Sequence, residues 1–255
     1  MTKEIKKNVE VVSLVFKSVK YLHFIAEQLK SDLCTAEGWR VGVRIVANDA
    51  TEEVLRELKN MEIPYSVYKH RDPDEFYLNR VYAAYNHCVI SSNFDNIVLV
   101  NSDDGFSKGW LENLLKHHDG INIPCSRLIE SGKMQSGTHG VNLGENNFGR
   151  SPDEFNYEGW EKWVEENKQD IIVPNGLYMP CLLNKENFIE AGMFPEGNIF
   201  LENGEPIAGY PNDRQVWKAG DDYFFHEVLE RKHGMRHVTA FDSLVYHIIE
   251  GEKDE

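Results

Sequence analysis

The sequence predicts an α/β protein with a mostly parallel central sheet and helices on both faces. Three observations predict this fold class. Short runs of β-branched and aliphatic residues alternate with segments whose apolar residues recur at helical spacing. The strand-like runs are largely apolar, which is typical of strands buried on both faces of a parallel sheet. Polar residues follow directly after three of these runs, at the edge where such sheets bind ligands.

The first half of the chain carries the regular alternation. Strands are predicted over residues 9–16, 41–47, 65–68 and 96–100, and helices over 21–33, shortly after 51, and over 78–90. Parallel neighbours cannot be joined by a tight hairpin and need a crossover connection, usually a helix. This order of elements therefore indicates a parallel sheet that is covered on both faces.

The second half is less regular. Helices are predicted over residues 110–117, 159–167, 185–191 and 222–232, and short strands over 171–173, 177–183, 236–240 and 244–247. Residues 126–158 are rich in Gly, Ser and Asn and are predicted to form a long loop region. Residues 197–218 contain several Gly and Pro residues and are predicted to form a mobile excursion.

The composition limits the classes of function. With 255 residues, 41% of them hydrophobic and 11% aromatic, the chain can fill a globular core. Its 27 basic and 42 acidic residues give a net charge of -15, which disfavours nucleic acid and anionic lipid as partners. A nucleotide diphosphate would need a metal ion or a few well-placed cations to bind such a protein.

Cysteine usage and hydropathy indicate where the protein works. The four cysteines are far apart in sequence and form no C-x-x-C pair, which favours a reduced protein. The N-terminal residues are charged and polar, unlike a signal peptide, and the longest apolar runs are too short to span a bilayer. We therefore expect a cytoplasmic protein with no transmembrane segment.

Carboxylates follow the apolar strand over residues 96–100. Asn101, Ser102, Asp103 and Asp104 stand at its end, where hard oxygen ligands can hold Mg²⁺ or Mn²⁺. Such an ion would bridge two phosphates and neutralise a leaving diphosphate. The alternative is a simple turn in which an Asp caps the helix over 110–117.

Two further groups of residues carry potential chemistry. Asp221 and Asp222 open the helix predicted at 222–232, and one of them could act as a general base towards an acceptor hydroxyl. The alternative is helix capping by the same side chains. His247 follows the last predicted strand and is either a metal ligand or a structural residue.

In this order, the motifs resemble those of the family 2 glycosyltransferases with the GT-A fold. The resemblance covers roughly two thirds of the chain and is most specific over residues 82–115. The segments that carry it are NDAT at 48–51, AAYNHCVISS at 83–92, NSDDGFSKGWLENLL at 101–115, AGMFPEG at 191–197, GDDYFFHEVLERKHG at 220–234 and VYH at 245–247.

The resemblance implies a donor site at the ends of the first, second and fourth strands. Asp49 occupies the position that contacts the nucleotide base or ribose. Phe16 and Ser18 stand where the family usually has Pro-Thr-Tyr. Asn86 lies on the helix that precedes the fourth strand, and it is assigned to the donor site as well.

It also implies a metal site and a catalytic base. Asp103 matches the last Asp of the family's D-x-D motif, and Asn101 replaces the first. Asp104 shares the metal or faces the donor ribose, and His247 matches a His that some members use as a further metal ligand. Asp222 matches the base of inverting members, with Asp221 in the preceding acidic position.

The function implied is metal-dependent transfer of a sugar from a nucleotide-diphosphate sugar to a glycan or other hydroxyl-bearing acceptor. We expect one domain over residues 1–255, in which 1–118 bind the donor and 119–255 carry the acceptor site and the base. A non-catalytic carbohydrate- or nucleotide-binding module on the same fold is the alternative. A nucleotidyltransferase is disfavoured, because the first strand is not followed by a Gly-rich, Arg-containing loop.

Overall fold

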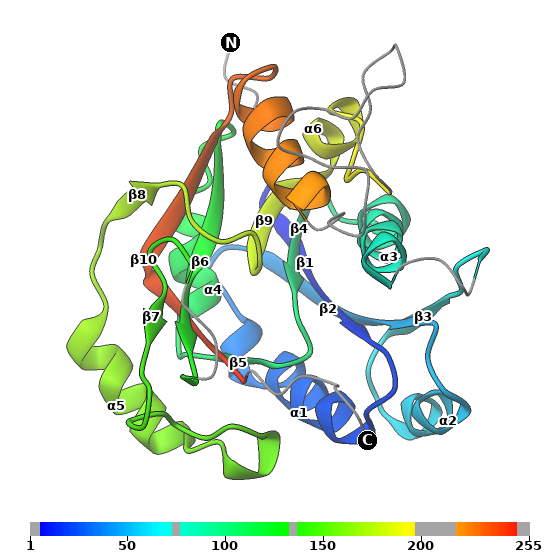
Figure 1. Cartoon of the computed structure of the whole chain (residues 1–255), viewed down its shortest axis with the longest axis vertical. Helices are drawn as coiled ribbons and strands as arrows, with labels where there is room; N and C mark the ends of the chain where they lie inside the picture. Colours follow the sequence, from blue (N-terminus) through cyan, green and yellow to red (C-terminus); the bar gives the residue numbers. More distant parts are fainter. Residues whose placement is uncertain (1–5, 73–76, 133–136, 197–217, 249–255) are drawn as a thin grey trace.

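Ten strands of the described part of the chain form one sheet. The computed structural model describes residues 6–72, 77–132, 137–196 and 218–248. The strand order is β3-β2-β1-β4-β9-β6-β10-β5, with β7 paired to β6 and β8 paired to β10 (Figure 1). The predicted excursion at 197–218 lies outside the described residues, except for its last residue.

The first half of the sheet is parallel, as predicted. Strand β1 pairs in parallel with β2 and β4, and β2 pairs in parallel with β3. The bounds of its elements are β1 Asn8–Val15, α1 Val19–Lys30, η1 Asp32–Cys34, β2 Arg40–Asn48, α2 Glu52–Asn60, β3 Tyr65–Tyr68, α3 Tyr77–Ser91 and β4 Asn96–Val100. Each helix follows one strand and precedes the next, which is the crossover that parallel pairing requires.

The second half mixes the two directions. Strand β9 runs antiparallel to both β4 and β6, β10 runs parallel to β6, and β5 and β8 pair antiparallel with β10. The bounds are β5 Asp104–Phe106, α4 Trp110–Lys116, β6 Asn122–Glu130, β7 Val141–Asn142, η2 Pro152–Glu154, α5 Tyr157–Asn167, β8 Ile172–Pro174, β9 Cys181–Asn184, α6 Lys185–Glu190, η3 Lys218–Glu230 and β10 Arg236–His247. The backbone of η3 has π-type hydrogen bonds.

Two predictions for this half were wrong. The region 126–158 is not a continuous loop, because it contains most of β6, all of β7, the short helix η2 and the start of α5. The two C-terminal strands are a single strand, β10, whose pairing with β6 shifts in register between Ala240 and Leu244. Polar residues in these strands interrupt the apolar pattern by which strands are predicted, but in the structure they are buried and hydrogen-bonded. Ser126 and Ser243, for example, join their hydroxyls across the two strands at 2.8 Å.

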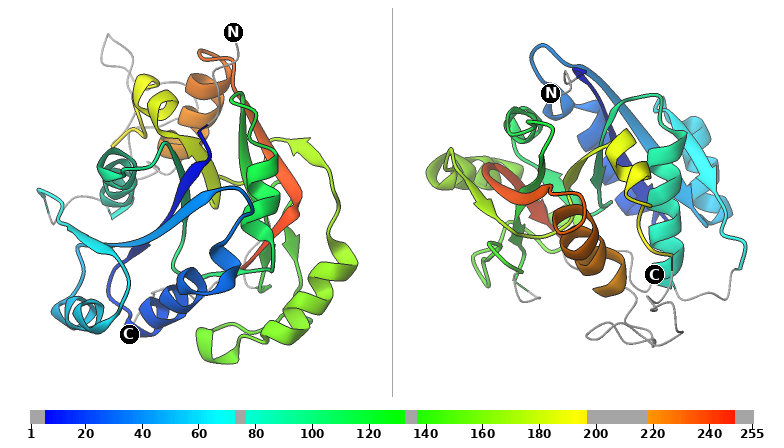
Figure 2. Two further views of the ribbon diagram at one scale, coloured as in Figure 1. Left: turned by 180° about the vertical axis from the view of Figure 1, so that it is seen from behind. Right: turned by 90° about the horizontal axis from the view of Figure 1, so that it is seen from above.

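Helices cover both faces of the sheet, as predicted (Figure 2). One apolar core joins α1, α2 and α4 to one face, and a second joins α3, α6 and η3 to the other. Alternate residues of a strand supply the two cores: Val11 belongs to the first and Val12 to the second. Strands that feed two cores must be apolar along their length, which explains the runs seen in the sequence.

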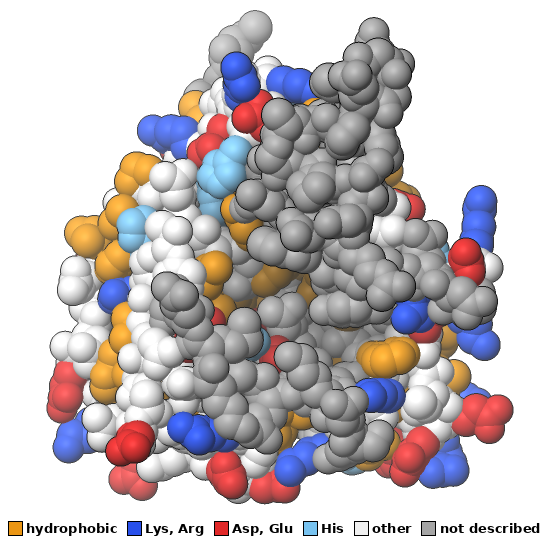
Figure 3. All heavy atoms as spheres, viewed as in Figure 1, with side chains coloured by type: hydrophobic (Ala, Val, Ile, Leu, Met, Phe, Trp, Pro, Cys, Tyr) orange, Lys and Arg blue, Asp and Glu red, His pale blue; other side chains and the backbone are white. Residues whose placement is uncertain are grey.

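A third apolar cluster packs α5 against the outer part of the sheet. Trp160 of α5 is completely buried and contacts Tyr246 of β10, with ring centroids 5.7 Å apart. No helix among the described residues is long and apolar enough to cross a membrane. Acidic and basic side chains are interspersed along the lower rim of the face in Figure 3, so the excess of acidic residues is not gathered into one patch there.

Candidate active site

The carboxyl ends of β1, β2 and β4 lie side by side. Val15 pairs with Ala47, and Ser13 pairs with Val100, so the chain leaves these three strands at one edge of the sheet. The segments that begin at Phe16, Asp49 and Asn101 therefore start near one another, as expected for a doubly covered parallel sheet. This edge brings the predicted donor and metal residues into one region.

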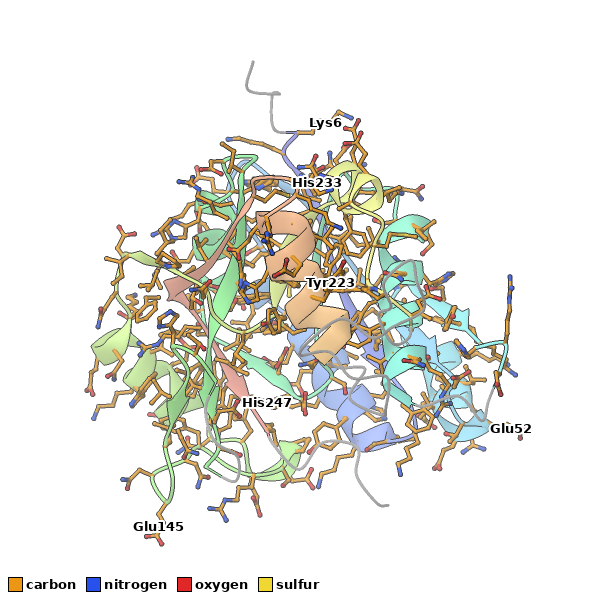
Figure 4. All side chains as sticks on the ribbon, turned by 45° about the horizontal axis from the view of Figure 1, so that its top comes forward. Lys6, Glu52, Glu145, Tyr223, His233 and His247 are labelled. Atoms are coloured by element: carbon orange, nitrogen blue, oxygen red, sulfur yellow. The ribbon has the colours of Figure 1, made fainter. Side chains whose placement is uncertain are left out.

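The end of β10 lies at the same edge. His233 stands just before β10 and His247 ends it, and Figure 4 shows them at opposite ends of the strand. His247 is paired in register with Glu130 of β6 on one side and with Asp104 of β5 on the other. Register partners point to the same face of a sheet, so these three side chains gather on one face.

Asp103 completes a cluster of three acidic residues around one imidazole. Its Oδ2 lies 3.3 Å from Nε2 of His247, and Nδ1 of His247 lies 2.8 Å from Oε2 of Glu130. The Ile248 N–H donates a hydrogen bond to the Asp103 carbonyl at 3.0 Å, which ties the loop after β4 to the end of β10. The predicted metal ligands Asp103 and His247 are thus in direct contact.

The electrostatics of this cluster are unusual for a buried site. Asp104 is fully buried, and burial followed by repulsion from Asp103 raises its pKa to about 8. One of its oxygens accepts a hydrogen bond from the Asn101 N–H at 2.8 Å, but the other has no hydrogen-bond partner among the described residues. Burial opposes the charged form of His247, yet Asp103 and Glu130 raise its pKa well above 6.5.

A divalent cation fits the residues at this position. Two ligands held roughly 2.1 Å from one ion at about a right angle are about 3 Å apart, close to the Asp103–His247 separation. The oxygen of buried Asp104 that no described residue hydrogen-bonds and the excess of carboxylates also favour a positive ion. Carboxylate and imidazole are common ligands of Mn²⁺ and related metals.

Asn101 and Asp49 have protein partners in this structure. Asn101 Oδ1 accepts a hydrogen bond from the Tyr85 hydroxyl at 2.8 Å. Asp49, which has a left-handed backbone with φ of 48°, accepts from the His70 N–H at 2.9 Å and from Arg80 Nη1 at 3.1 Å. Both carboxylate oxygens of Asp49 are therefore engaged at the donor edge.

The other predicted donor residues differ in their surroundings. Phe16 is exposed after β1, whereas Ser18 is buried and its hydroxyl accepts from the Tyr21 N–H at the start of α1. Asn86 is also buried. Its amide donates to the Phe194 carbonyl at 2.8 Å and accepts from the Phe194 N–H at 3.0 Å. Ser18 and Asn86 thus hold the backbone around the site.

The predicted catalytic residues lie in the first turns of η3. The backbone of Asp221 and Asp222 belongs to that helix, but their side chains lie outside the described residues. Glu130 is the residue that sequence reasoning missed. It follows Leu128 and Ile129 at the end of a strand, which is the pattern that indicated Asp103, but it fell within the region predicted to be a loop.

A second group of potential ligands lies away from this edge. His117, Asp170 and Asp242 place one ligand atom each within 4.8 Å of one another. Lys116 forms ion pairs with both Asp170 and Asp242, so an ammonium already balances their charge. Asp242 is five residues before His247, roughly 15 Å along a strand, which separates this group from the Asp103–His247 pair.

Comparison with known proteins supports the predicted fold. No protein-family model and no curated protein sequence matches this chain. Among solved structures, it resembles TarS (residues 1–349) of S. aureus in complex with UDP-GlcNAc, with 13% identity, a TM-score of 0.52, and coverage of 94% of this chain and 58% of that one. GalNAc-T7 with UDP, GalNAc and Mn²⁺ gives 11% identity, a TM-score of 0.54, and coverage of 96% and 44%.

The mannosyltransferase PcManGT from Pyrobaculum calidifontis, in complex with GDP-Man and Mn²⁺, gives 12% identity, a TM-score of 0.52, and coverage of 94% of this chain and 56% of that one. The chain thus spans about half the length of these proteins. At such low identity the likeness establishes the fold, which is that of the GT-A glycosyltransferases.

Proposed function

We propose that this protein is a metal-dependent glycosyltransferase that moves a sugar from a nucleotide-diphosphate sugar to an acceptor hydroxyl. The observation that carries the proposal is the contact between Asp103 and His247 at the carboxyl edge of a GT-A sheet. The neighbours named above contain UDP-GlcNAc, UDP or GDP-Man, and two of them contain Mn²⁺. Fold alone does not define function. The proposal therefore depends on the site residues as well as on the fold.

In the proposed mechanism, Asp103 and His247 hold the metal. A bound Mn²⁺ or Mg²⁺ supplies positive charge for the leaving diphosphate. The protein has a net charge of -15, so the donor phosphates depend on such local positive charge. Asn101 and Asp104 shape the loop that carries Asp103, since the Asn101 N–H donates to the Asp104 carboxyl group.

The transfer step is proposed to be a single displacement with inversion. Asp222 takes the proton of the acceptor hydroxyl as general base, and the oxygen attacks the anomeric carbon as the nucleotide diphosphate departs. Asp221 stands beside it at the start of η3, where the positive end of a helix favours ionised carboxylates. These two roles rest on the motif order in the sequence.

The first experiment measures donor binding. Unfolding temperature is recorded with UDP-, GDP-, dTDP- and CMP-linked sugars, each with Mn²⁺ and with a chelator. A donor at a hundred times its Kd adds about 2.7 kcal/mol to the free energy of unfolding. We expect this gain for one nucleotide class, only with Mn²⁺, in wild type and in the control Asp170→Asn, and its loss in Asp103→Asn.

No gain with any donor would contradict the proposed function. Donor binding without transfer to any acceptor or to water would instead favour the non-catalytic binding module. Product analysis then tests the base. Asp222→Asn should lower transfer by roughly 10²–10⁴-fold while donor binding and unfolding temperature stay unchanged, and near-normal transfer by this variant would assign the base elsewhere.

A further inference from the structure

Glu130 is a buried carboxylate that contacts the far side of the His247 ring. Its Oε2 lies 2.8 Å from Nδ1, whereas Asp103 faces Nε2 on the opposite side of the ring. Glu130 is 4% exposed and lies on β6, whereas Asp103 lies in the turn between β4 and β5. A single imidazole therefore bridges two carboxylates, one on the proposed metal side and one behind it.

The hydrogen bond between Glu130 and His247 has a defined direction. A carboxylate only accepts hydrogen bonds, so the proton must be on Nδ1 of His247. With its proton fixed there, the ring presents the lone pair of Nε2 when it binds a metal. Metal-bound histidines commonly donate their other N–H to a carboxylate in this way, which orients the ring and raises its basicity as a ligand.

The sheet holds this arrangement rigidly. Glu130 and His247 are register partners in the parallel pair β6–β10, and the Ser131 N–H donates to the His247 carbonyl at 3.3 Å. The Leu143 N–H donates to the Glu130 carbonyl at 3.2 Å from the other side. The backbone at Glu130 is thus bonded to both neighbouring segments, which limits its movement relative to His247.

We propose that Glu130 is a positioning residue. By accepting a hydrogen bond from Nδ1, it orients the His247 ring so that Nε2 can bind a divalent cation, and so sets the affinity of the site for that cation. This inference rests on the proposed function, because it assumes that Asp103 and His247 bind the metal. Glu130 itself acts through His247 and does not touch the ion. Loss of such a partner typically lowers metal affinity by about 10–100-fold.

The test measures Mn²⁺ binding directly. Free Mn²⁺ is titrated by electron paramagnetic resonance in wild type, Glu130→Gln, Glu130→Ala and Asp103→Asn, and the modulation from a coordinated ¹⁴N nucleus is recorded on the bound ion. Asp170→Asn is the matched control, because it removes an exposed carboxylate from the group containing His117 and leaves the Asp103–His247 pair intact. Unfolding temperature is measured for each variant.

We expect wild type and Asp170→Asn to bind Mn²⁺ equally, with a nitrogen signal. Glu130→Gln should bind about 10–100-fold more weakly, and Glu130→Ala should in addition lose the nitrogen signal, since nothing then orients the ring. Both variants should retain cooperative unfolding. A merely structural role for Glu130 would change the unfolding temperature without changing the nitrogen signal.

The outcomes distinguish a failure of the positioning role of Glu130 from a failure of the proposed metal-dependent function. If wild type binds no Mn²⁺, or if Asp103→Asn binds as well as wild type, the proposed metal site fails and the inference fails with it. If wild type binds and Asp103→Asn does not, but both Glu130 variants bind within about twofold of wild type with the nitrogen signal intact, the positioning role alone is overturned.

Discussion

Two buried groups of charged residues in this protein are built on opposite plans. Glu10 and Arg44 face each other between β1 and β2, with two hydrogen bonds of 3.1 and 3.0 Å joining guanidinium and carboxylate. Arg44 also donates to the Cys88 carbonyl and to the hydroxyls of Ser66 and Ser91. Each charge in this pair has an opposite charge and a full set of partners.

The group at the end of β10 is not balanced in this way, because three carboxyl groups share one imidazole. Asp103, Asp104 and Glu130 surround one imidazole, and within the described part of the chain one oxygen of buried Asp104 has no hydrogen-bond partner. Burying a charge without compensation is costly, so such a group is maintained only where something else neutralises it. Under the proposed function, the Glu10–Arg44 pair stabilises the fold, whereas the group at the end of β10 binds a metal ion. The following three variants test that distinction.

The largest effect is expected from breaking the balanced pair. Arg44→Met leaves the Glu10 carboxylate buried and unpaired, which should lower the free energy of unfolding by about 3–5 kcal/mol. The measurement is urea unfolding at neutral pH. The double variant Glu10→Leu/Arg44→Met should recover most of this loss, because no charge is then left unpaired. A single variant as stable as wild type would show that the pair is not structural.

A smaller effect is expected from His237, a buried histidine whose ring contacts no carboxylate of a described residue. Burial lowers the pKa of His237 to about 4, so the folded protein keeps this ring neutral while the unfolded chain takes up a proton below about 6.5. The stability of the folded protein that depends on the neutral His237 ring is therefore fully present above pH 6.5. About 3 kcal/mol of the free energy of unfolding is lost in total as the pH falls towards 4.

His237→Gln should remove this part of the pH dependence. The measurement is the free energy of unfolding of both proteins at pH 7 and pH 4.5, where the wild type should lose more stability than the variant. Equal losses would mean that His237 is protonated in the folded state. The contrast with His247 is informative, because carboxylates raise the pKa of that ring in spite of its burial.

The smallest effect is expected from relieving the unbalanced group. Asp104→Asn keeps an oxygen for the Asn101 N–H and removes a carboxyl group whose charged form is disfavoured first by burial and then by repulsion from Asp103. Without metal, the variant should be more stable than wild type by about 1 kcal/mol, measured by urea unfolding in the presence of a chelator. A loss of stability comparable to that of Arg44→Met would place Asp104 among the structural residues.

The sequence predicted the parallel half of the fold well, for a physical reason. Strands such as β1 and β4 contribute to two apolar cores, so they are apolar on both faces and are easily predicted as buried strands. Strand β6 was missed because Ser126 and Arg127 interrupt it. Arg127 is accommodated by a hydrogen bond to the His139 carbonyl and by the Phe241 ring 4.1 Å away. Such partners come from distant segments and leave no local pattern.

In the candidate site too, some residues were predicted from the sequence and others depend on contacts between distant segments. Asp103 and His247 were predicted as a pair from motif order, and the structure places them in contact. Glu130 was not predicted, because its importance depends on the register between β6 and β10. The side chains of Asp221 and Asp222 lie outside the described residues, so their assignment as catalytic residues stays a prediction.

The pairing of Asn86 with Phe194 has a consequence for how this protein tolerates change. The carboxamide donates to the carbonyl and accepts from the N–H of one residue, Phe194, as a residue of a neighbouring strand would. An aspartate offers no donor, an alanine offers nothing, and glutamine is one methylene longer in a site that is 3% exposed. Variation at this position should therefore be nearly forbidden. A comparison of related sequences would then show an invariant Asn at this position, whether or not it also contacts the donor.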